Sequence, residues 1–294
     1  MKVDSRSYYS TLPPLGHECG DIWCNLPSFG MLGDTPCAGI VITPACDLSW
    51  QKSDTLTYLP IVSIRTFFSM DAALPAVIER VGINLQATGY DFDTKWSAQS
   101  YVPPTNEELI RLQKELEGYR SAQQRSSKIL AAIERTIASI NVLQAIASPE
   151  LTSIDGGKLG ANFGSEWDKI KEKMIRNSYS PALHFLPFDG QDVVFSGVRE
   201  HSVVLFRYPI TVPVKMLNYA EETSDSAWSE CVNNLNISLS LKKAFIPARP
   251  VKMLSLRPAF LSDLLTRFSA LYNRIGSPDF TKETISLYSS EIGL

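Results

Sequence analysis

The sequence is poor in the residue types on which metal and thiol chemistry depend. Only three histidines and five cysteines occur among its 294 residues. Four of the cysteines lie near the N-terminus, but their intervals are C-x4-C, C-x12-C and C-x8-C, whereas structural zinc sites show two closely spaced pairs. The glycine-rich segment 156 to 164 lacks the Lys-Ser/Thr ending of a phosphate-binding loop. We therefore expect no metal and no cofactor.

Two further absences narrow the functional class. The formal net charge is -3, so the basic excess of a dedicated nucleic-acid binder is missing. The first ten residues, MKVDSRSYYS, contain no apolar segment of the kind that signal peptides carry, and no apolar run reaches the ~18 residues that span a bilayer. We expect a cytoplasmic protein with free thiols and no membrane association, since an odd number of cysteines fits a reducing compartment.

Three short apolar runs near the N-terminus predict strands. They lie at 21 to 26, 38 to 43 and 55 to 64. Each is bounded by Gly, Pro, Asp or Lys, and all three are rich in β-branched or aromatic residues, a pattern typical of strands in a small barrel.

A second group of strands is predicted in the C-terminal half. Asp189-Gly190 separates the apolar runs 182 to 188 and 192 to 197, and this dipeptide between apolar runs predicts a hairpin. Residues 201 to 217 predict further strand. Residues 237 to 256 alternate or run apolar and are interpreted as strands or loops over the core.

The middle of the chain predicts a long helical arm. Thr105 and Glu108 form a capping-box pattern, in which each side chain accepts a hydrogen bond from the other residue's amide. Apolar residues then recur at three- and four-residue spacing up to Ile140, interrupted by Gln123 and Ser126. The pattern predicts an arm over 105–147, either as one helix roughly 65 Å long or as a hairpin folded back at the polar interruption.

A narrow and sustained apolar stripe favours pairing with another chain. We expect the arm to bind a partner protein, or a second copy, through Leu130, Ile133, Ile137 and Ile140. The alternative is that the arm packs on its own domain, as amphipathic helices commonly do.

Shorter helices are predicted elsewhere. One lies near 71 to 81 and another from 165 to 174, with the glycine-rich segment 151 to 164 interpreted as a flexible link before it. The last helix, 258 to 275, begins with proline and is followed by glycine. Its wide apolar face predicts that it packs on the core.

Several of these strands resemble a known family. The segments Gly20-Asp21-Ile22-Trp23, Gly39-Ile40-Val41-Ile42-Thr43 and Leu59-Pro60-Ile61-Val62-Ser63 are similar to the first three strands of PemK/MazF-like small β-barrel proteins, which are toxins of toxin–antitoxin pairs. Residues 202 to 217 resemble that family's late strand pair, and the last helix resembles its closing helix. The resemblance implies an α+β fold, an SH3-like barrel interrupted by a large helical insertion.

The same resemblance implies metal-independent cleavage of single-stranded RNA. That activity uses an arginine before the second strand, which stabilises charge on phosphate, and a threonine or serine at the end of the third. This chain has Pro36-Cys37-Ala38 at the first place and Val62 at the second, with Ser63 beside it. No catalytic residue is therefore carried over from the family.

The candidates for a relocated catalytic site are Ser63, Arg65, Cys46 and Asp47. Cys46 would need a neighbouring base and a lowered thiol pKa, and the sequence places no histidine beside it. The structural interpretation of Cys46-Asp47 is a small buried thiol followed by a carboxylate that ends the strand in an Asx-turn.

These observations divide the chain into 1–68 and 181–294, which form the barrel, and the insertion 69–180. We expect a non-catalytic interaction module of a bacterial stress or anti-phage defence assembly, which binds a partner protein through the barrel groove and the arm. A divergent endoribonuclease is the alternative. A third interpretation is a barrel that binds RNA or DNA without cleavage, helped by the basic excess between Lys242 and Arg257, which otherwise forms a solvated face.

Overall fold

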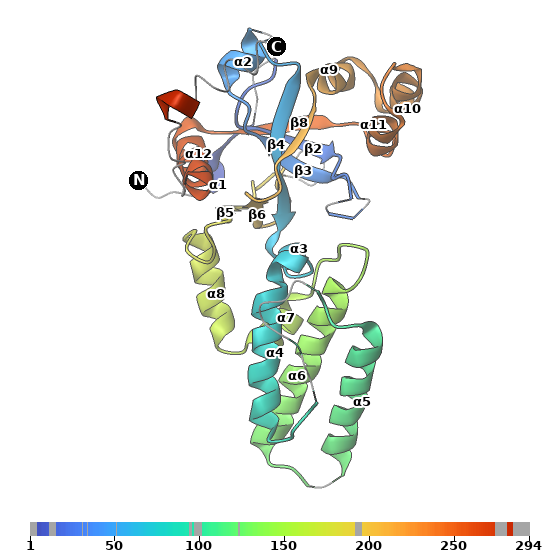
Figure 1. Cartoon of the computed structure of the whole chain (residues 1–294), viewed down its shortest axis with the longest axis vertical. Helices are drawn as coiled ribbons and strands as arrows, with labels where there is room; N and C mark the ends of the chain where they lie inside the picture. Colours follow the sequence, from blue (N-terminus) through green and yellow to red (C-terminus); the bar gives the residue numbers. More distant parts are fainter. Residues whose placement is uncertain are drawn as a thin grey trace.

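The chain folds into two lobes, as a computed structural model shows (Figure 1). The structure describes residues 5–11, 16–30, 32–33, 35–50, 52–93, 96, 102–122, 124–191, 196–273 and 281–284. The sheet lobe contains an eight-stranded sheet covered by helices, and the helical lobe projects from one end of it. The α+β class is therefore confirmed.

The sheet lobe is built from segments on both sides of the helical lobe. Its order is β1-β8-β2-β3-β4-β6-β5, with β7 also pairing β4, and every described pair is antiparallel. The three strand predictions near the N-terminus are confirmed, and within 237 to 256, which was interpreted as strands or loops, residues 251 to 256 form a strand. The strands are β1 (Tyr9–Ser10), β2 (Asp21–Leu26), β3 (Cys37–Val41), β4 (Thr55–Ser63), β5 (Leu183–Leu186), β6 (Ser202–Leu205), β7 (Ile210–Pro213) and β8 (Val251–Leu256).

The hydrogen-bond ladder of this sheet is open, whereas the sequence predicted a closed barrel. The ladder ends at β1 on one side and at β5 on the other. A side chain links the two ends instead: the buried Tyr9 hydroxyl donates to the carbonyl oxygen of Pro187, just after β5, at 2.6 Å. The edges are thus brought together without a strand pair between them.

The central strand β4 changes partner halfway along its length. Its first half pairs β7 and its second half pairs β6, while β3 pairs across the change. Ile42 donates to Thr57 on the β3 side, and Ile64 donates to His201 on the β6 side, so even-numbered residues of β4 point their backbone groups toward β6 and β7. Pro60, which has no N–H, occupies the even position between the two partners, where the ladder needs no donor.

The two faces of the sheet bury different helices. One face packs Ile22, Ile40 and Leu59 against α12 (Pro258–Tyr272), so the predicted packing of the last helix is confirmed. The other face packs Trp23, Val41 and Tyr58 against three helices. These are α9 (Val214–Glu222), α10 (Asp225–Asn234) and α11 (Leu239–Phe245).

One prediction about the short elements around the sheet is wrong. Residues 239 to 245 were interpreted as strand or loop but form α11, because Ser238 caps the helix at the Leu241 amide and Phe245 is fully buried beside Trp228. Two further short helices belong to this lobe, α1 (Ser5–Tyr8) and α2 (Ala45–Ser49).

The helical lobe begins directly at the end of β4 (Figure 1). Its elements are α3 (Ile64–Phe67), the 3-10 helix η1 (Asp71–Ala73), α4 (Leu74–Thr88), α5 (Asn106–Ser121), α6 (Ser127–Ile146), α7 (Gly156–Phe163) and α8 (Glu166–Ile175). The glycine-rich segment predicted as a flexible link contains α7. The Asp155 carboxylate caps this helix at the amides of Gly157 and Lys158, and Leu159 and Phe163 are buried, which holds the segment in place.

The predicted arm is a hairpin and not one long helix. The capping box between Thr105 and Glu108 is present at the start of α5. Helix α5 ends at Ser121, and the Ser126 hydroxyl accepts from the Ile129 amide to begin α6. The polar interruption of the apolar stripe is therefore the turn of the hairpin.

The apolar seam of this hairpin faces the lobe's own core, which corrects the prediction of a partner-binding surface. Ile133 and Ile140 are fully buried, and Leu130 and Ile137 are partly buried. The helix α6 is long and apolar enough to cross a membrane, contrary to the expectation from the sequence, but half of its apolar stretch is buried, and α4 and α7 pack against it. It has the position of a core helix of the helical lobe.

Three sequence predictions lie partly or wholly outside the described residues. They are the second strand of the hairpin at Asp189-Gly190, for which 192–195 are not described, the stripe position Gln123, and the end of the last helix beyond Asn273. The predicted strand 201 to 217 is confirmed in part, because β6 and β7 are followed by α9.

A fully buried histidine on β5 makes the fold sensitive to acid. Neither ring nitrogen of His184 has a partner among the described residues, and the ring stacks on Phe206 with a centroid distance of 6.1 Å. Burial lowers the His184 pKa from 6.5 to about 4; Asp263 opposes this shift and Arg267 adds to it.

We expect the free energy of unfolding to fall by about 3 kcal/mol as the pH drops from 6.5 to 4. The unfolded chain binds this proton at a higher pH than the folded chain does, so stability is lost across that window. A His184→Leu variant should lack this component of the acid dependence and keep its stability at pH 8, because no hydrogen bond is removed. Urea titrations at several pH values measure both, and a wild-type slope retained in the variant would contradict the assignment.

A candidate binding groove between the two lobes

A groove lies at the C-terminal end of β4, where the sheet lobe meets the helical lobe. It consists of two overlapping cavities of about 290 and 280 Å3. The segment after α6 forms part of its wall, and Ile154 of that segment donates to the carbonyl oxygen of Arg65 at 3.4 Å. The residues common to both cavities are Pro36, Cys37, Ala38, Ile61, Ser63 and Thr66.

Two thiols from neighbouring strands line this groove. Cys37 begins β3 opposite Leu26, and Cys24 lies on β2, where an irregularity in the β2–β3 register follows Trp23. Burial raises the pKa of Cys37 to about 12 and also raises that of Cys24. Both thiols are therefore protonated at neutral pH, the form that is a poor nucleophile.

The candidate Ser63 lines the groove but has a structural task there. Its hydroxyl oxygen accepts from the Thr66 amide at 3.0 Å, which caps α3, and lies 2.9 Å from the Thr66 hydroxyl. Among the described residues, no histidine or carboxylate forms a hydrogen bond with it. Ser63 thus fixes the angle at which the helical lobe leaves β4.

The candidate Arg65 is paired. Its guanidinium donates to both carboxylate oxygens of Glu200, with nitrogen–oxygen distances of 2.9 to 3.1 Å. Glu200 lines the groove, and both side chains are 43% exposed. Because Arg65 forms this bidentate ion pair with Glu200, its guanidinium is largely neutralised and is poorly placed to bind a ligand.

The neighbouring Arg199 offers an uncommitted cation at the same groove. It is exposed and has no ion pair with any residue in the described part of the chain. Its position is set by a buried carboxylate: Asp189 accepts from the amides of Gly197 and Val198 at 2.8 and 2.9 Å. A side chain at Gly197 would meet the Cβ of Met253 at 2.9 Å, so this loop depends on glycine to pack against β8.

The other two candidates, Cys46 and Asp47, lie elsewhere. Both belong to α2, at the opposite end of β4 from α3 (Figure 1). Cys46 is exposed rather than buried, and its thiol donates to the Asp47 carboxylate at 3.5 Å. Of the four candidates, Ser63 therefore lines the groove and Arg65 pairs with a residue that lines it, while Cys46 and Asp47 lie apart from both.

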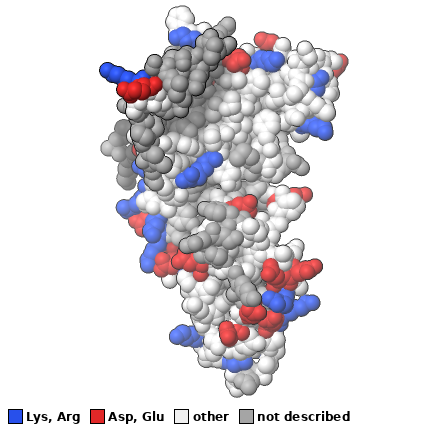
Figure 2. All heavy atoms as spheres, in the orientation of Figure 1, with Lys and Arg blue, Asp and Glu red and all other residues white. Residues whose placement is uncertain are grey.

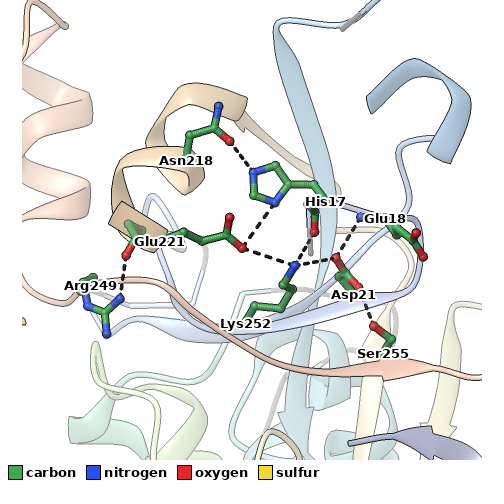
Figure 3. Close-up of polar contacts among 10 residues, drawn as sticks. His17, Glu18, Asp21, Asn218, Glu221, Arg249, Lys252 and Ser255 are labelled. Atoms are coloured by element: carbon green, nitrogen blue, oxygen red, sulfur yellow. Dashed lines mark hydrogen bonds and ion pairs between the residues drawn. The ribbon is translucent and has the colours of Figure 1, made fainter. Parts of the chain in front are cut away.

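A buried ionic network in the sheet lobe was missed by the sequence reasoning (Figure 3). The Lys252 ammonium on β8 lies 3.3 Å from Glu221 on α9 and 3.8 Å from Asp21 on β2. It also donates to the carbonyl oxygen of Gly16, while His17 is bonded to Asn218 at 2.6 Å. The network joins two strands and a helix, and it has no residue in common with the groove.

Asp21 is the most deeply buried charged residue of this network. The side chain is fully buried, and desolvation raises its pKa. Hydrogen bonds from Ser255 and from the Glu18 amide oppose that shift, as does the positive charge of Lys252. The only sequence signal was a carboxylate at the first position of a strand, followed by three apolar residues.

Comparison of the chain with family models, with curated proteins and with solved structures finds no match. The site must therefore be interpreted from its own chemistry. Within the described residues, no group of three or more His, Cys, Asp or Glu side chains is placed to hold a metal ion. On the face seen in Figure 2, acidic and basic side chains are intermixed over the helical lobe, where Arg111–Glu115 and Arg120–Glu134 form ion pairs.

Proposed function

We propose that the chain is a protein-binding module whose groove receives a segment of a partner protein. The observation that carries this proposal is a groove at the junction of the lobes whose lining includes Arg199, a cation without an ion pair among the residues that the structure describes. A carboxylate of the partner beside Arg199 would satisfy that charge. The open sheet is, in this proposal, a divergent form of the PemK/MazF-like barrel, which is supported by the pairing of β4 with both β6 and β7.

Binding is better supported than catalysis because the reactive groups of the groove are already engaged. The thiols of Cys24 and Cys37 are protonated, the Ser63 hydroxyl caps a helix, and Glu200 neutralises Arg65. The wider setting, an accessory role in a bacterial stress or anti-phage assembly, rests on the resemblance to toxin-like proteins alone. In this role the helical lobe provides a wall of the groove.

The alternative, a divergent endoribonuclease, has one point in its favour. Arg199 and the Ser63 hydroxyl line the same groove, and a free guanidinium is the group that would bind a phosphate. A barrel that binds RNA or DNA without cleavage would use the same arginine.

A photo-crosslinking experiment tests the proposed binding. A benzophenone amino acid replaces Ser153, which lines the groove and is exposed, or Ser121, which ends α5 at the far tip of the helical lobe. In the organism that encodes the chain, we expect one discrete protein adduct from position 153 and none from 121. Arg199→Glu should lower its yield about tenfold, because charge reversal repels the partner's carboxylate, while Arg207→Glu should leave it unchanged.

Other outcomes of these experiments would contradict the proposed binding. Equal adducts from positions 153 and 121, or an adduct indifferent to Arg199→Glu, would refute the groove as the binding site. Cleavage of single-stranded RNA by the purified chain, lost in Arg199→Gln, would establish the nuclease instead. Binding of RNA without cleavage, with the same dependence on Arg199, would establish the third interpretation.

A further inference from the structure

A second cavity, of about 350 Å3, lies where α3 and η1 face β5 and β6. Phe67 and Tyr179 contribute rings that meet edge to face, 6.4 Å between centroids, and Tyr208 contributes a third ring. Ala72 and Ala182 line it with single methyl groups, which leaves the space open. A volume of this size falls within the range of small-molecule sites, about 300 to 1,000 Å3.

The charged side chain that lines this cavity is a cation. Arg207 is the charged residue among the described residues that line it, and it has no hydrogen bond or ion pair within the described part of the chain. The turn that carries Arg207 is fixed on both sides, because Phe206 donates to the carbonyl of Ala182 at 2.9 Å and Tyr208 donates to that of Leu205 at 3.2 Å. The backbone that carries Arg207 is thus fixed beside the aromatic cavity that this residue lines.

Hydroxyl groups complete the polar lining. The Ser180 oxygen accepts from the Ala182 amide at 3.2 Å, which leaves its O–H able to donate. Burial and the nearby Glu79 raise the Tyr179 pKa, so that hydroxyl also remains a donor at neutral pH. Aromatic walls, hydroxyl donors and one guanidinium match a planar ring that carries one negative charge, since guanidinium binds carboxylate with two parallel hydrogen bonds.

We propose that this cavity binds a small aromatic monocarboxylate, with its ring among Phe67, Tyr179 and Tyr208 and its carboxylate on Arg207. None of these residues lines the groove, so the proposal stands independently of the protein-binding function. The site would give the chain a small-molecule ligand at the junction of its two lobes.

Titration of the purified full chain with 2-naphthoate, followed by the fluorescence of the naphthoate, tests the site. We expect saturable one-to-one binding that Arg207→Gln weakens at least tenfold and that Arg199→Gln leaves unchanged. The neutral 2-naphthamide should bind the wild type and Arg207→Gln equally, because it has no charge for the arginine to bind. Ala72→Leu and Ala182→Leu, which fill the cavity from opposite walls, should each abolish binding of both probes.

Absence of saturable 2-naphthoate binding would overturn the proposal. So would binding that survives both leucine variants, or a loss on Arg207→Gln that is equal for the charged and the neutral probe. Circular dichroism of each variant shows whether it is folded, and Arg207→Gln, an exchange at an exposed side chain, keeps the test decisive if a leucine variant fails to fold.

Discussion

Replacing Ile133 by aspartate is expected to unfold the helical lobe. The Ile133 side chain is fully buried on α6, in the core that α4 and α5 share. An aspartate there loses the apolar burial and places a carboxylate among apolar side chains, so we expect a loss of more than about 4 kcal/mol in the free energy of unfolding. Chemical denaturation followed by circular dichroism measures the loss.

A matched control lies on the neighbouring helix. Ile110 is 45% exposed on α5, and Ile110→Asp should change the free energy of unfolding by no more than about 0.5 kcal/mol. If instead Ile133→Asp folds with wild-type stability and fails only to bind another protein, the seam of the hairpin is a partner surface, and the packing described above is wrong at that position.

The same residue illustrates how far the sequence predicts this fold. Apolar spacing and the Thr105 cap predicted the helices correctly, because both are local properties of the chain. Spacing alone could not identify the neighbour of the stripe, since a seam against α4 and a seam against another chain require the same side chains. In the structure the stripe packs against α4. This helix was itself only partly predicted, as a short helix at 71 to 81.

The residues of the groove were likewise predicted only in part. Ser63 and Arg65 were singled out from the end of a predicted strand, and the structure places Ser63 in the lining of the groove and pairs Arg65 with Glu200, which lines it. The partner of Arg65 could not be predicted, because Glu200 is 135 positions away from Arg65 in the chain. The sequence did not indicate Arg199 as a site residue. Its exposure depends on the hydrogen bonds that the amides of Gly197 and Val198 donate to the Asp189 carboxylate.

Lys252→Met is expected to cost about 3 to 5 kcal/mol of unfolding free energy at neutral pH, although the sequence placed this lysine in a solvated basic face. The side chain is only 9% exposed and stands between Asp21 and Glu221. Methionine keeps much of the side chain's length and removes the charge, so Asp21 would remain buried without its cation. Lys243→Met, at an exposed lysine on α11, is the matched control and should have little effect.

The pH dependence of this loss identifies its cause. The folded-state pKa of Asp21 is already raised by burial, and removal of Lys252 raises it further. The folded variant then takes up the proton at a higher pH than the unfolded chain, so the deficit relative to the wild type should shrink as the pH falls from 8 toward 5. Asp21→Asn combined with Lys252→Met should recover part of the stability at pH 8. A deficit that is constant with pH and untouched by the second substitution would mean that Lys252 stabilises the sheet lobe through the contact of its ammonium with the Trp23 ring, 5.8 Å from the ring centroid, and not through its ion pair with Asp21.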